Sequence, residues 1–267
     1  MQLTKSLLLL AALTSTALAR LEGHERRQAP TTTSADPSDT SGTSSATSSG
    51  SATSSGSGSY STAGFGARTA NSGSGITYQG NVGSPWGSNM IEISADEASN
   101  YKYVAQISGQ NTDPWTVTFF NKYGPDGQMD GWYGFSAVQF TLNAGETKYI
   151  AFDEDTNGGF AAASGSTIPV DSSGGYASTW GEFDFGSSGN SGWSGFDVSA
   201  IAPQNAGKTV QGMKICETVS GTCSSITENA ASVDNAYTTA ETAVGGIGGN
   251  IQEDRQIVLD VTIDYQG

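Results

Sequence analysis

The chain contains almost no histidine, few basic residues and no long apolar run, and each shortage excludes a class of function. Its one histidine is His24, close to the N-terminus. Catalysis by Ser-His-Asp or Cys-His groups therefore has no histidine available in the rest of the chain. Zinc, copper and non-haem iron likewise lack their commonest ligand. Enzymatic chemistry would have to depend on carboxylates, as in glycoside hydrolysis.

Basic charge is scarce as well, with 11 Lys and Arg against 26 Asp and Glu and a formal net charge of −15. Proteins bind phosphate backbones through clustered Lys and Arg. The composition therefore excludes nucleic acid as a partner, and an acidic surface also repels anionic lipid. Neutral sugars, cationic ligands and calcium remain compatible with this charge, so the composition favours a binding function over catalysis.

The N-terminus has the pattern of an export signal. Lys5 precedes an apolar run at residues 6–13, and Ala17 and Ala19 supply the small residues that a signal peptidase requires. The run is too short to span a bilayer, which needs roughly 20 apolar residues. We therefore predict a signal peptide over residues 1–19, a secreted, extracellular product and no membrane insertion.

A dibasic pair, Arg26 and Arg27, follows the predicted signal peptide. Secretory-pathway proteases cut at such pairs, so residues 20–27 are predicted to be a propeptide and the mature chain to begin at Gln28. The alternative is an ordinary basic pair that is not processed.

Serine and threonine dominate the next segment, with 19 of them among the 30 residues 31–60. Such a stretch cannot bury enough apolar surface to offset its ordering entropy. Residues 28–64 are therefore predicted to be a disordered, O-glycosylated tether, and the chain has no Asn-x-Ser/Thr acceptor site. The tether is either a spacer that holds the domain away from a cell wall or a solubilising tail.

The character of the chain changes at residue 65, because all five tryptophans lie beyond it. Runs rich in β-formers, separated by Gly, Ser, Asn and Asp turns, predict a mainly β domain over residues 65–267, in the form of a β-sandwich with one or two short helices. The expected strands are residues 76–78, 103–107, 115–120, 138–142, 148–152, 182–185, 210–215 and 257–265. The strands at 138–142 and 148–152 are predicted to form a hairpin, and helices are predicted at 95–100 and 230–244.

Cys216 and Cys223 are the only cysteines. In the oxidising compartment that the signal peptide implies, they should form a disulfide. The loop that it closes is short, so its stabilising contribution should be about 2–3 kcal/mol at most. The hydrophobic core, rather than disulfides, must therefore hold the fold.

One acidic segment resembles the first half of a calcium loop. Asp153, Asp155 and Asn157 occupy the spacing D-x-D-x-N-G, but Ser164 stands where the twelfth position needs a bidentate Glu. The alternative, an acidic turn at a strand end, fits the segment better. Calcium is thus the one cofactor that the sequence leaves open, and no other is predicted.

Carboxylates and aromatic residues are interleaved between positions 180 and 197. Carboxylates beside aromatic faces could bind a sugar, and two carboxylates at a suitable separation could form a glycosidase pair. In the alternative interpretation, Glu182 and Asp184 merely share a strand face while Phe183 and Phe185 fill the core. We assign no catalytic residue, and the predicted binding residues are Trp180, Glu182, Asp184, Trp193 and Asp197.

Several longer motifs resemble one known family. They lie at residues 74–89, 113–117, 145–149, 179–185, 192–201 and 210–216. Together they closely resemble the fungal secreted allergens typified by Aspergillus major allergen four, over nearly all of residues 65–267. The resemblance implies an extracellular location and binding of host IgE, and it implies no particular enzymatic activity. Association with the cell wall is a separate expectation.

A looser similarity is to the thaumatin-like β-sandwich. Glu182 and Asp197 match two acids of that family's cleft, whereas Ala200 and its neighbours stand where a further Asp would be. The similarity implies a sandwich fold. It leaves three functions open: a domain that binds cell-wall polysaccharide, a carboxylate-dependent β-glucan hydrolase and an effector that binds a host protein.

Overall fold

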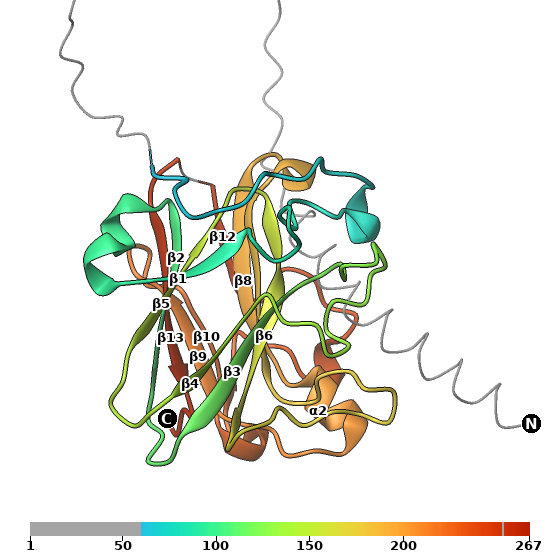
Figure 1. Cartoon of the computed structure of the whole chain (residues 1–267). Helices are drawn as coiled ribbons and strands as arrows, with labels where there is room; N and C mark the ends of the chain where they lie inside the picture. Colours follow the sequence, from blue (N-terminus) through green and yellow to red (C-terminus); the bar gives the residue numbers. More distant parts are fainter. Residues whose placement is uncertain (1–59, 253) are drawn as a thin grey trace, which may run out of the picture.

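Two β-sheets packed face to face form the fold (Figure 1). The structure is a computed structural model that describes residues 60–252 and 254–267. The predicted signal peptide, the predicted propeptide and the predicted tether up to residue 59 lie outside the described residues. No helix among the described residues is long and apolar enough to cross a membrane. The predicted sandwich is confirmed.

The seven-stranded sheet has the strand order β1-β5-β2-β13-β9-β10-β11. Its strands are β1 (Met90–Ile93), β2 (Tyr103–Gly109), β5 (Lys148–Phe152), β9 (Met213–Glu217), β10 (Cys223–Ile226), β11 (Val233–Asp234) and β13 (Ile257–Ile263). The C-terminal strand β13 lies in the middle of this sheet, parallel to β2 and antiparallel to β9. Strand β13 therefore joins the two halves of this sheet.

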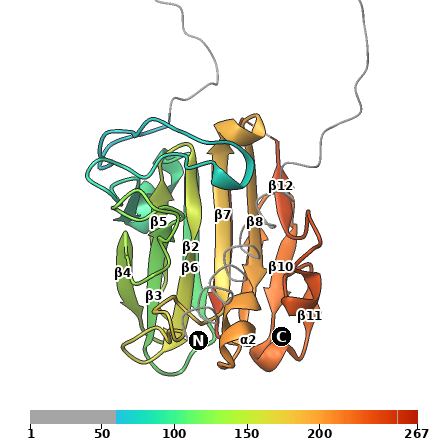
Figure 2. The ribbon, with the colours of Figure 1, turned by 90° about the vertical axis from the view of Figure 1, so that its right-hand side faces the viewer.

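The six-stranded sheet has the order β12-β8-β7-β6-β3-β4 and faces the viewer in Figure 2. Its strands are β3 (Trp115–Asn121), β4 (Val138–Leu142), β6 (Thr156–Ser164), β7 (Trp180–Ser187), β8 (Trp193–Ser199) and β12 (Gly249–Ile251). The helical elements are short: α2 (Ile201–Ala206) and the 3-10 turns η1 (Gly75–Thr77), η2 (Ala95–Asn100), η3 (Ser188–Asn190), η4 (Glu228–Ala230) and η5 (Thr239–Glu241).

The main core lies between the sheets because alternate residues of each strand point inward. Its centre is a group of phenylalanines, in which Phe119 lies 4.9 Å from Phe160 and Phe152 lies 4.7 Å from Phe183, measured between ring centroids. Each of these rings is almost completely buried. Burial of one such ring stabilises the fold by about 1.5–3 kcal/mol, so this core can support the sandwich with a single disulfide.

The disulfide joins Cys216 and Cys223, which face each other on β9 and β10. It links two neighbouring antiparallel strands whose Cα atoms are 4.1 Å apart at that point. The predicted pairing is confirmed, and the bond closes the hairpin at its loop end.

Most of the predicted strands are present, but the predicted hairpin is wrong. Strand β4 pairs with β3 in the six-stranded sheet, whereas β5 pairs with β1 and β2 in the seven-stranded sheet. The connection at residues 143–147 therefore passes from one sheet to the other. The turn residues and the alternation suit either arrangement, and only the packing of both strands on the shared core decides between them.

Two further local predictions are wrong. Residues 76–78 lie at the η1 turn rather than in a strand, and residues 230–244 form no α-helix but contain β11 and the short 3-10 element η5. Positive φ angles at Asn229, Ala230 and Asn235 interrupt any helix there. The predicted helix at 95–100 is the 3-10 helix η2, which begins with a capping box of Ser94 and Glu97.

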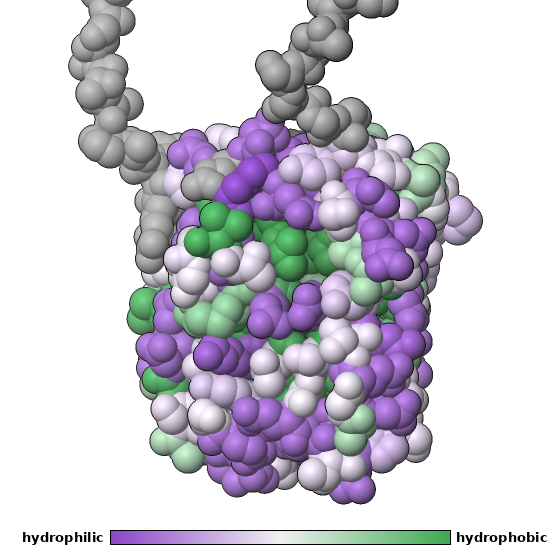
Figure 3. Space-filling view, turned by 90° about the vertical axis from the view of Figure 1, so that its left-hand side faces the viewer, coloured by the Kyte–Doolittle hydropathy of each residue, from purple (hydrophilic) through white to green (hydrophobic). Residues whose placement is uncertain are grey.

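Each sheet also carries an apolar cluster on its outer face. On the six-stranded sheet the cluster consists of Phe120, Trp132, Ala161, Tyr176 and Trp180. On the seven-stranded sheet it consists of Tyr101, Val104 and Ala151, with partly buried neighbours that include Phe65. Figure 3, which views the side of the seven-stranded sheet, shows apolar side chains gathered in a hollow in the upper part of that face.

Candidate binding face on the six-stranded sheet

Strands β7 and β8 position the predicted binding residues. Along β7, Phe183 and Phe185 point into the main core, whereas Trp180 belongs to the outer apolar cluster. Because side chains alternate along a strand, Glu182 and Asp184 lie on the same outer face as Trp180. The phenylalanines thus fix the strand, and the outer face is left for the polar residues.

The register between β7 and β8 brings three carboxylates together. Glu182 lies directly opposite Asp197, and Asp184 lies one row further along, opposite Gly195. Directly opposed residues have Cβ atoms about 4.5–5.5 Å apart. We call Glu182, Asp184 and Asp197 the carboxylate row. Asp197 is 1% exposed and Asp184 6% exposed, whereas Glu182 is half-buried.

Glycines stand opposite two members of this row. The residue opposite Glu182 on β6 is Gly159, and the residue opposite Asp184 on β8 is Gly195. A Cβ at Gly159 would lie 3.0 Å from the ring of Phe120, so that ring occupies the space beside Gly159. Asp184 and Asp197 are almost fully buried, and Glu182 is the member of the row that reaches solvent.

The two predicted tryptophans play different roles. Trp180 is buried, donates from Nε1 to the carbonyl oxygen of Tyr176 at 3.1 Å and packs edge-on against Phe120 at 5.2 Å. It therefore forms a wall beside the row rather than an open stacking surface. Trp193 is half-buried at the start of β8, opposite Ser187, and alternation places it on the same outer face as Asp197.

Two further polar residues lie beside the row. Asn157 on β6 is opposite Asp184 and is 1% exposed. Lys122 follows β3, donates its backbone N–H to the carbonyl oxygen of Asn157 at 3.2 Å, and its Nζ donates to the carbonyl oxygen of Tyr78 at 3.0 Å. The sequence analysis did not single out Lys122. Phe120 points outward from β3 and Lys122 comes two residues later, so alternation of side chains along the strand could have placed Lys122 on the same face.

The three residues of the predicted calcium segment have separate partners. Asp153 accepts two hydrogen bonds from Arg68, at 2.8 and 2.6 Å, and a third from Asn81. Asp155 accepts from the hydroxyl group of Tyr78 at 2.6–2.7 Å. Asn157 lies beside the carboxylate row instead.

Within residues 60–252 and 254–267, no group of three or more His, Cys, Asp or Glu could hold a metal ion. Calcium at this segment stays a prediction.

The chemistry of the face suits hydroxyl groups. Ionised carboxylates accept hydrogen bonds through two oxygens, and each sugar hydroxyl can donate one. Such charge-assisted bonds are stronger than neutral ones. An acidic face with an adjacent lysine and amide, on a rigid sandwich, can therefore hold a polyhydroxylated molecule in a defined orientation.

A two-sheet β-sandwich with a carboxylate-bearing outer face is the class that this geometry defines. The chain belongs to the Allergen Asp f 4-like family, whose domain matches residues 88–263. It is similar to Allergen Asp f 4 of Aspergillus fumigatus, with 55% identity over 205 residues that cover 77% of this chain and 63% of that relative. The match thus spans less than two thirds of the relative's length.

Among solved structures, the chain is similar to the protein elicitor MoHrip2 from Magnaporthe oryzae. The similarity covers 61% of this chain and 99% of that one, with a TM-score of 0.39 and 13% identity. A likeness at this level carries no argument about function.

Proposed function

We propose that the chain is a secreted allergen-like protein that binds IgE of sensitised hosts and that, in its native setting, binds neutral cell-wall polysaccharide through the carboxylate row. Membership of the Asp f 4-like family supports the first part. The observation that carries the second is the direct opposition of Glu182 and Asp197 on one outer face, with Asp184 beside them.

Carboxylate oxygens accept hydrogen bonds from sugar hydroxyl groups, and such charge-assisted bonds are stronger than neutral ones. The register of β7 with β8 places these acceptors on neighbouring strands of one outer face. In this binding mode Glu182, the half-buried member of the row, contacts the sugar. Asp184 and Asp197 lie almost fully buried beside it, and Trp193 flanks the chain of sugars.

A second candidate function is hydrolysis of β-glucan. Retaining glycosidases hold their two carboxyl groups only about 5–5.5 Å apart, and Glu182 and Asp197 lie directly opposite each other on neighbouring strands. In such a reaction one carboxyl group would protonate the leaving oxygen while the other attacked the anomeric carbon. We favour binding because the absence of a match for the further cleft Asp removes one element of the thaumatin-like pattern.

Retention of the full secreted chain on insoluble β-glucan, chitin and mannan tests the proposal. We expect retention on at least one polymer and a loss of at least tenfold in Glu182→Gln and Asp197→Asn. Asp96→Asn is the matched control, because Asp96 is an exposed carboxylate on η2 beside the other sheet. Retention that is absent, or that is unchanged by Glu182→Gln, would refute binding through the row.

Two further readouts on the same samples separate the remaining parts of the proposal. Release of reducing sugar that disappears in Glu182→Gln would establish hydrolysis in place of simple binding. Immunoblotting with serum from sensitised hosts tests IgE binding. We expect IgE to bind the folded chain whether or not Glu182 is replaced, since an antibody does not depend on the sugar ligand.

A further inference from the structure

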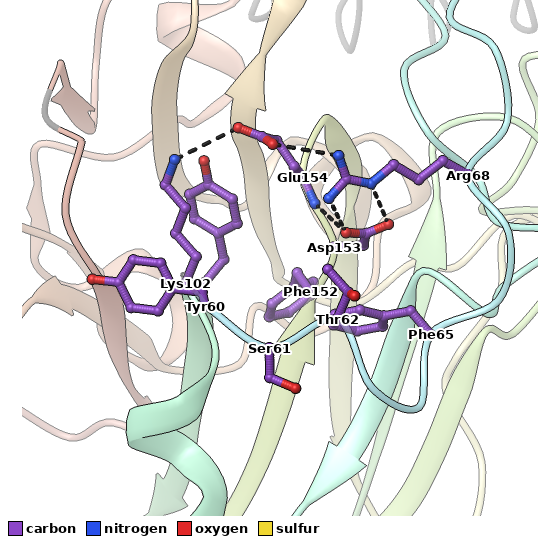
Figure 4. Close-up of a pocket in the computed structure, with 10 residues that line it drawn as sticks. Tyr60, Ser61, Thr62, Phe65, Arg68, Lys102, Phe152, Asp153 and Glu154 are labelled. Atoms are coloured by element: carbon purple, nitrogen blue, oxygen red, sulfur yellow. Dashed lines mark hydrogen bonds and ion pairs between the residues drawn. The ribbon is translucent and has the colours of Figure 1, made fainter. Parts of the chain in front are cut away.

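A cavity of about 240 Å³ lies where the described chain begins, far along the sequence from the carboxylate row. Residues 60–68 form one wall, and the start of β2 and the end of β5 form the rest. We call it the junction pocket, since it lies directly after the Ser/Thr-rich segment at residues 31–60. Figure 4 shows the residues that line it.

One side of the junction pocket is aromatic and carries hydroxyl groups. Phe65 is held edge-on to Tyr101, with ring centroids 5.6 Å apart, and Phe152 packs against Phe185 at 4.8 Å. In Figure 4 the side chain of Thr62 lies beside these two phenylalanines. Tyr60 also lines the pocket and lies beside Lys102 in Figure 4. Aromatic faces attract the polarised C–H groups of a ligand ring.

The other side is charged, and its charges are satisfied within the protein. Arg68 donates from Nε and Nη2 to Asp153 at 2.8 and 2.6 Å and from Nη1 to Glu154 at 3.4 Å. Lys102 lies 3.6 Å from Glu154 and 2.8 Å from Asp254. No basic group on this side is left without an acidic partner. The pocket therefore offers no unpaired charge to a charged ligand.

The same groups can still make hydrogen bonds with a neutral ligand. Arg68 has five N–H donors and uses three of them in these bonds, and the Glu154 carboxylate has about four acceptor sites and, among the described residues, contacts only Arg68 and Lys102 on this side. A hydroxyl group both donates and accepts, so adjacent guanidinium and carboxylate groups suit a ring bearing several hydroxyls. The ion pairs also hold the wall in place, because Asp153 is 4% exposed and is bound by Asn81 as well. A preformed site loses little entropy on binding.

The size of the pocket limits the ligand. Sites for drug-sized molecules usually have volumes of about 300–1,000 Å³, so a cavity of about 240 Å³ suits something smaller. A single hexose unit combines an apolar ring face with several hydroxyl groups and has this size. We propose that the junction pocket binds one neutral hexose unit, at a site separate from the carboxylate row.

The hexose could come from two sources with the same chemistry. One is the end of a free or wall-bound polysaccharide. The other is a sugar attached to this chain, because Thr62 is exposed and lines the pocket, and the serines and threonines just before it are predicted glycosylation sites. In the second case the chain's own sugar would anchor the segment at residues 60–68 to the domain.

Saturation-transfer NMR with methyl α-mannoside and methyl β-glucoside tests the site. The full chain, produced without glycosylation, should bind at least one of the two. Thr62→Tyr fills the pocket and should weaken that binding at least tenfold. Thr167→Tyr, at an exposed threonine on a distant loop, is the matched control and should bind normally. Circular dichroism checks that all variants are folded.

A second arm distinguishes the sources. Peptide mass spectrometry of the chain secreted by a fungal host locates attached hexoses. If a sugar is attached at Thr62 or just before it and the hexosides bind only after its removal, the occupant is the chain's own glycan; if the glycosylated chain binds them directly, it is a free saccharide.

The proposal is overturned if neither hexoside binds the unglycosylated chain, or if Thr62→Tyr binds normally. Glu182→Gln should leave hexoside binding unchanged, so failure of the carboxylate row and failure of the pocket are distinguishable.

Discussion

The hairpin of β9 and β10 and the outer face of β7 and β8 both contain buried carboxylates, but different kinds of residue face these carboxylates in the two regions. Glu217, 0% exposed at the end of β9, accepts two hydrogen bonds from Arg255, at 2.9 and 3.0 Å, and two more from the backbone N–H groups of Val219 and Ser220. On β7 and β8, Glu182 instead faces another acidic residue, Asp197.

The difference separates a structural carboxylate from a functional one. An arginine and two backbone donors surround Glu217, so its charge ties the loop between β9 and β10 to the segment before β13. In the carboxylate row, acidic residues lie directly opposite each other on neighbouring strands, and under the proposed function this face serves a ligand. The predictions below test whether the two regions really differ in this way.

The largest effect should follow from breaking the Glu217–Arg255 pair. Replacing Arg255 by Met leaves a buried carboxylate without its main counter-charge, and such changes typically cost about 3–5 kcal/mol. Urea unfolding of the variant should show a loss of this size. Lys208→Met, at an exposed position after α2, is the control and should change stability little. A loss below about 1 kcal/mol for Arg255→Met would show that the pair is not structural.

The same pair should make stability depend on acidity. Burial alone would raise the pKa of Glu217, but the hydrogen bonds from Arg255 and the backbone lower it overall, from 4.5 to about 2. A carboxylate with a lowered pKa in the folded state stabilises the fold above its unfolded pKa and loses that contribution as the pH falls through the folded value.

The stability advantage of the parent chain over Glu217→Gln should therefore shrink between pH about 4.5 and about 2, by up to about 3 kcal/mol. Parallel urea titrations at several pH values measure it. A stability advantage that stays constant over this pH range would contradict the lowered pKa of Glu217. Glu182→Gln provides the comparison, measured over the same pH range.

A smaller effect is expected from the disulfide in the same hairpin. Replacing Cys216 and Cys223 together by Ser removes a short loop closure and should cost about 2–3 kcal/mol at most. Differential scanning calorimetry of the double variant measures the change. Adding reductant to the parent chain should reproduce it, whereas reductant should not affect the variant. If the midpoint temperature of unfolding does not change, the hydrogen bonds between β9 and β10 hold the hairpin without the disulfide.

The strands could be predicted from the sequence where the β-propensity of the residues agrees with their place in the sheets. Strands β2, β3 and β13 are rich in β-branched and aromatic residues, and all three were predicted. Strand β6 was not, because its sequence, Thr156–Ser164, is mainly Gly, Ala and polar residues with low β-propensity. It is a strand because β3 and β7 pair with it on both sides. Pairing between distant segments, which the sequence does not display, overrides propensity there.

The candidate site was predictable in part for a similar reason. Alternation alone places Glu182 and Asp184 on one strand face. The opposition of Asp197 to Glu182 depends on the register of β7 with β8, which turns and packing set. The arginine partners of Asp153 and Glu217 could not be predicted from the sequence, since Arg68 and Asp153 are 85 residues apart and Arg255 and Glu217 are 38 residues apart. Only the folded chain brings such pairs together.

The smallest stability effect, and the sharpest distinction between the two regions, should come from neutralising the carboxylate row. Glu182→Gln keeps the shape of the side chain at a half-buried position, so the free energy of unfolding should change by no more than about 0.5 kcal/mol. The contrast with Arg255→Met is one of size.

Urea unfolding and polysaccharide retention, measured on the same preparations, test this contrast. A variant that is as stable as the parent chain but has lost retention identifies a carboxylate kept for a ligand. If Glu182→Gln instead loses several kcal/mol, the row is structural like Glu217, and a loss of retention would then reflect unfolding. If stability and retention are both unchanged, Glu182 takes no part in binding, and binding through the row is refuted.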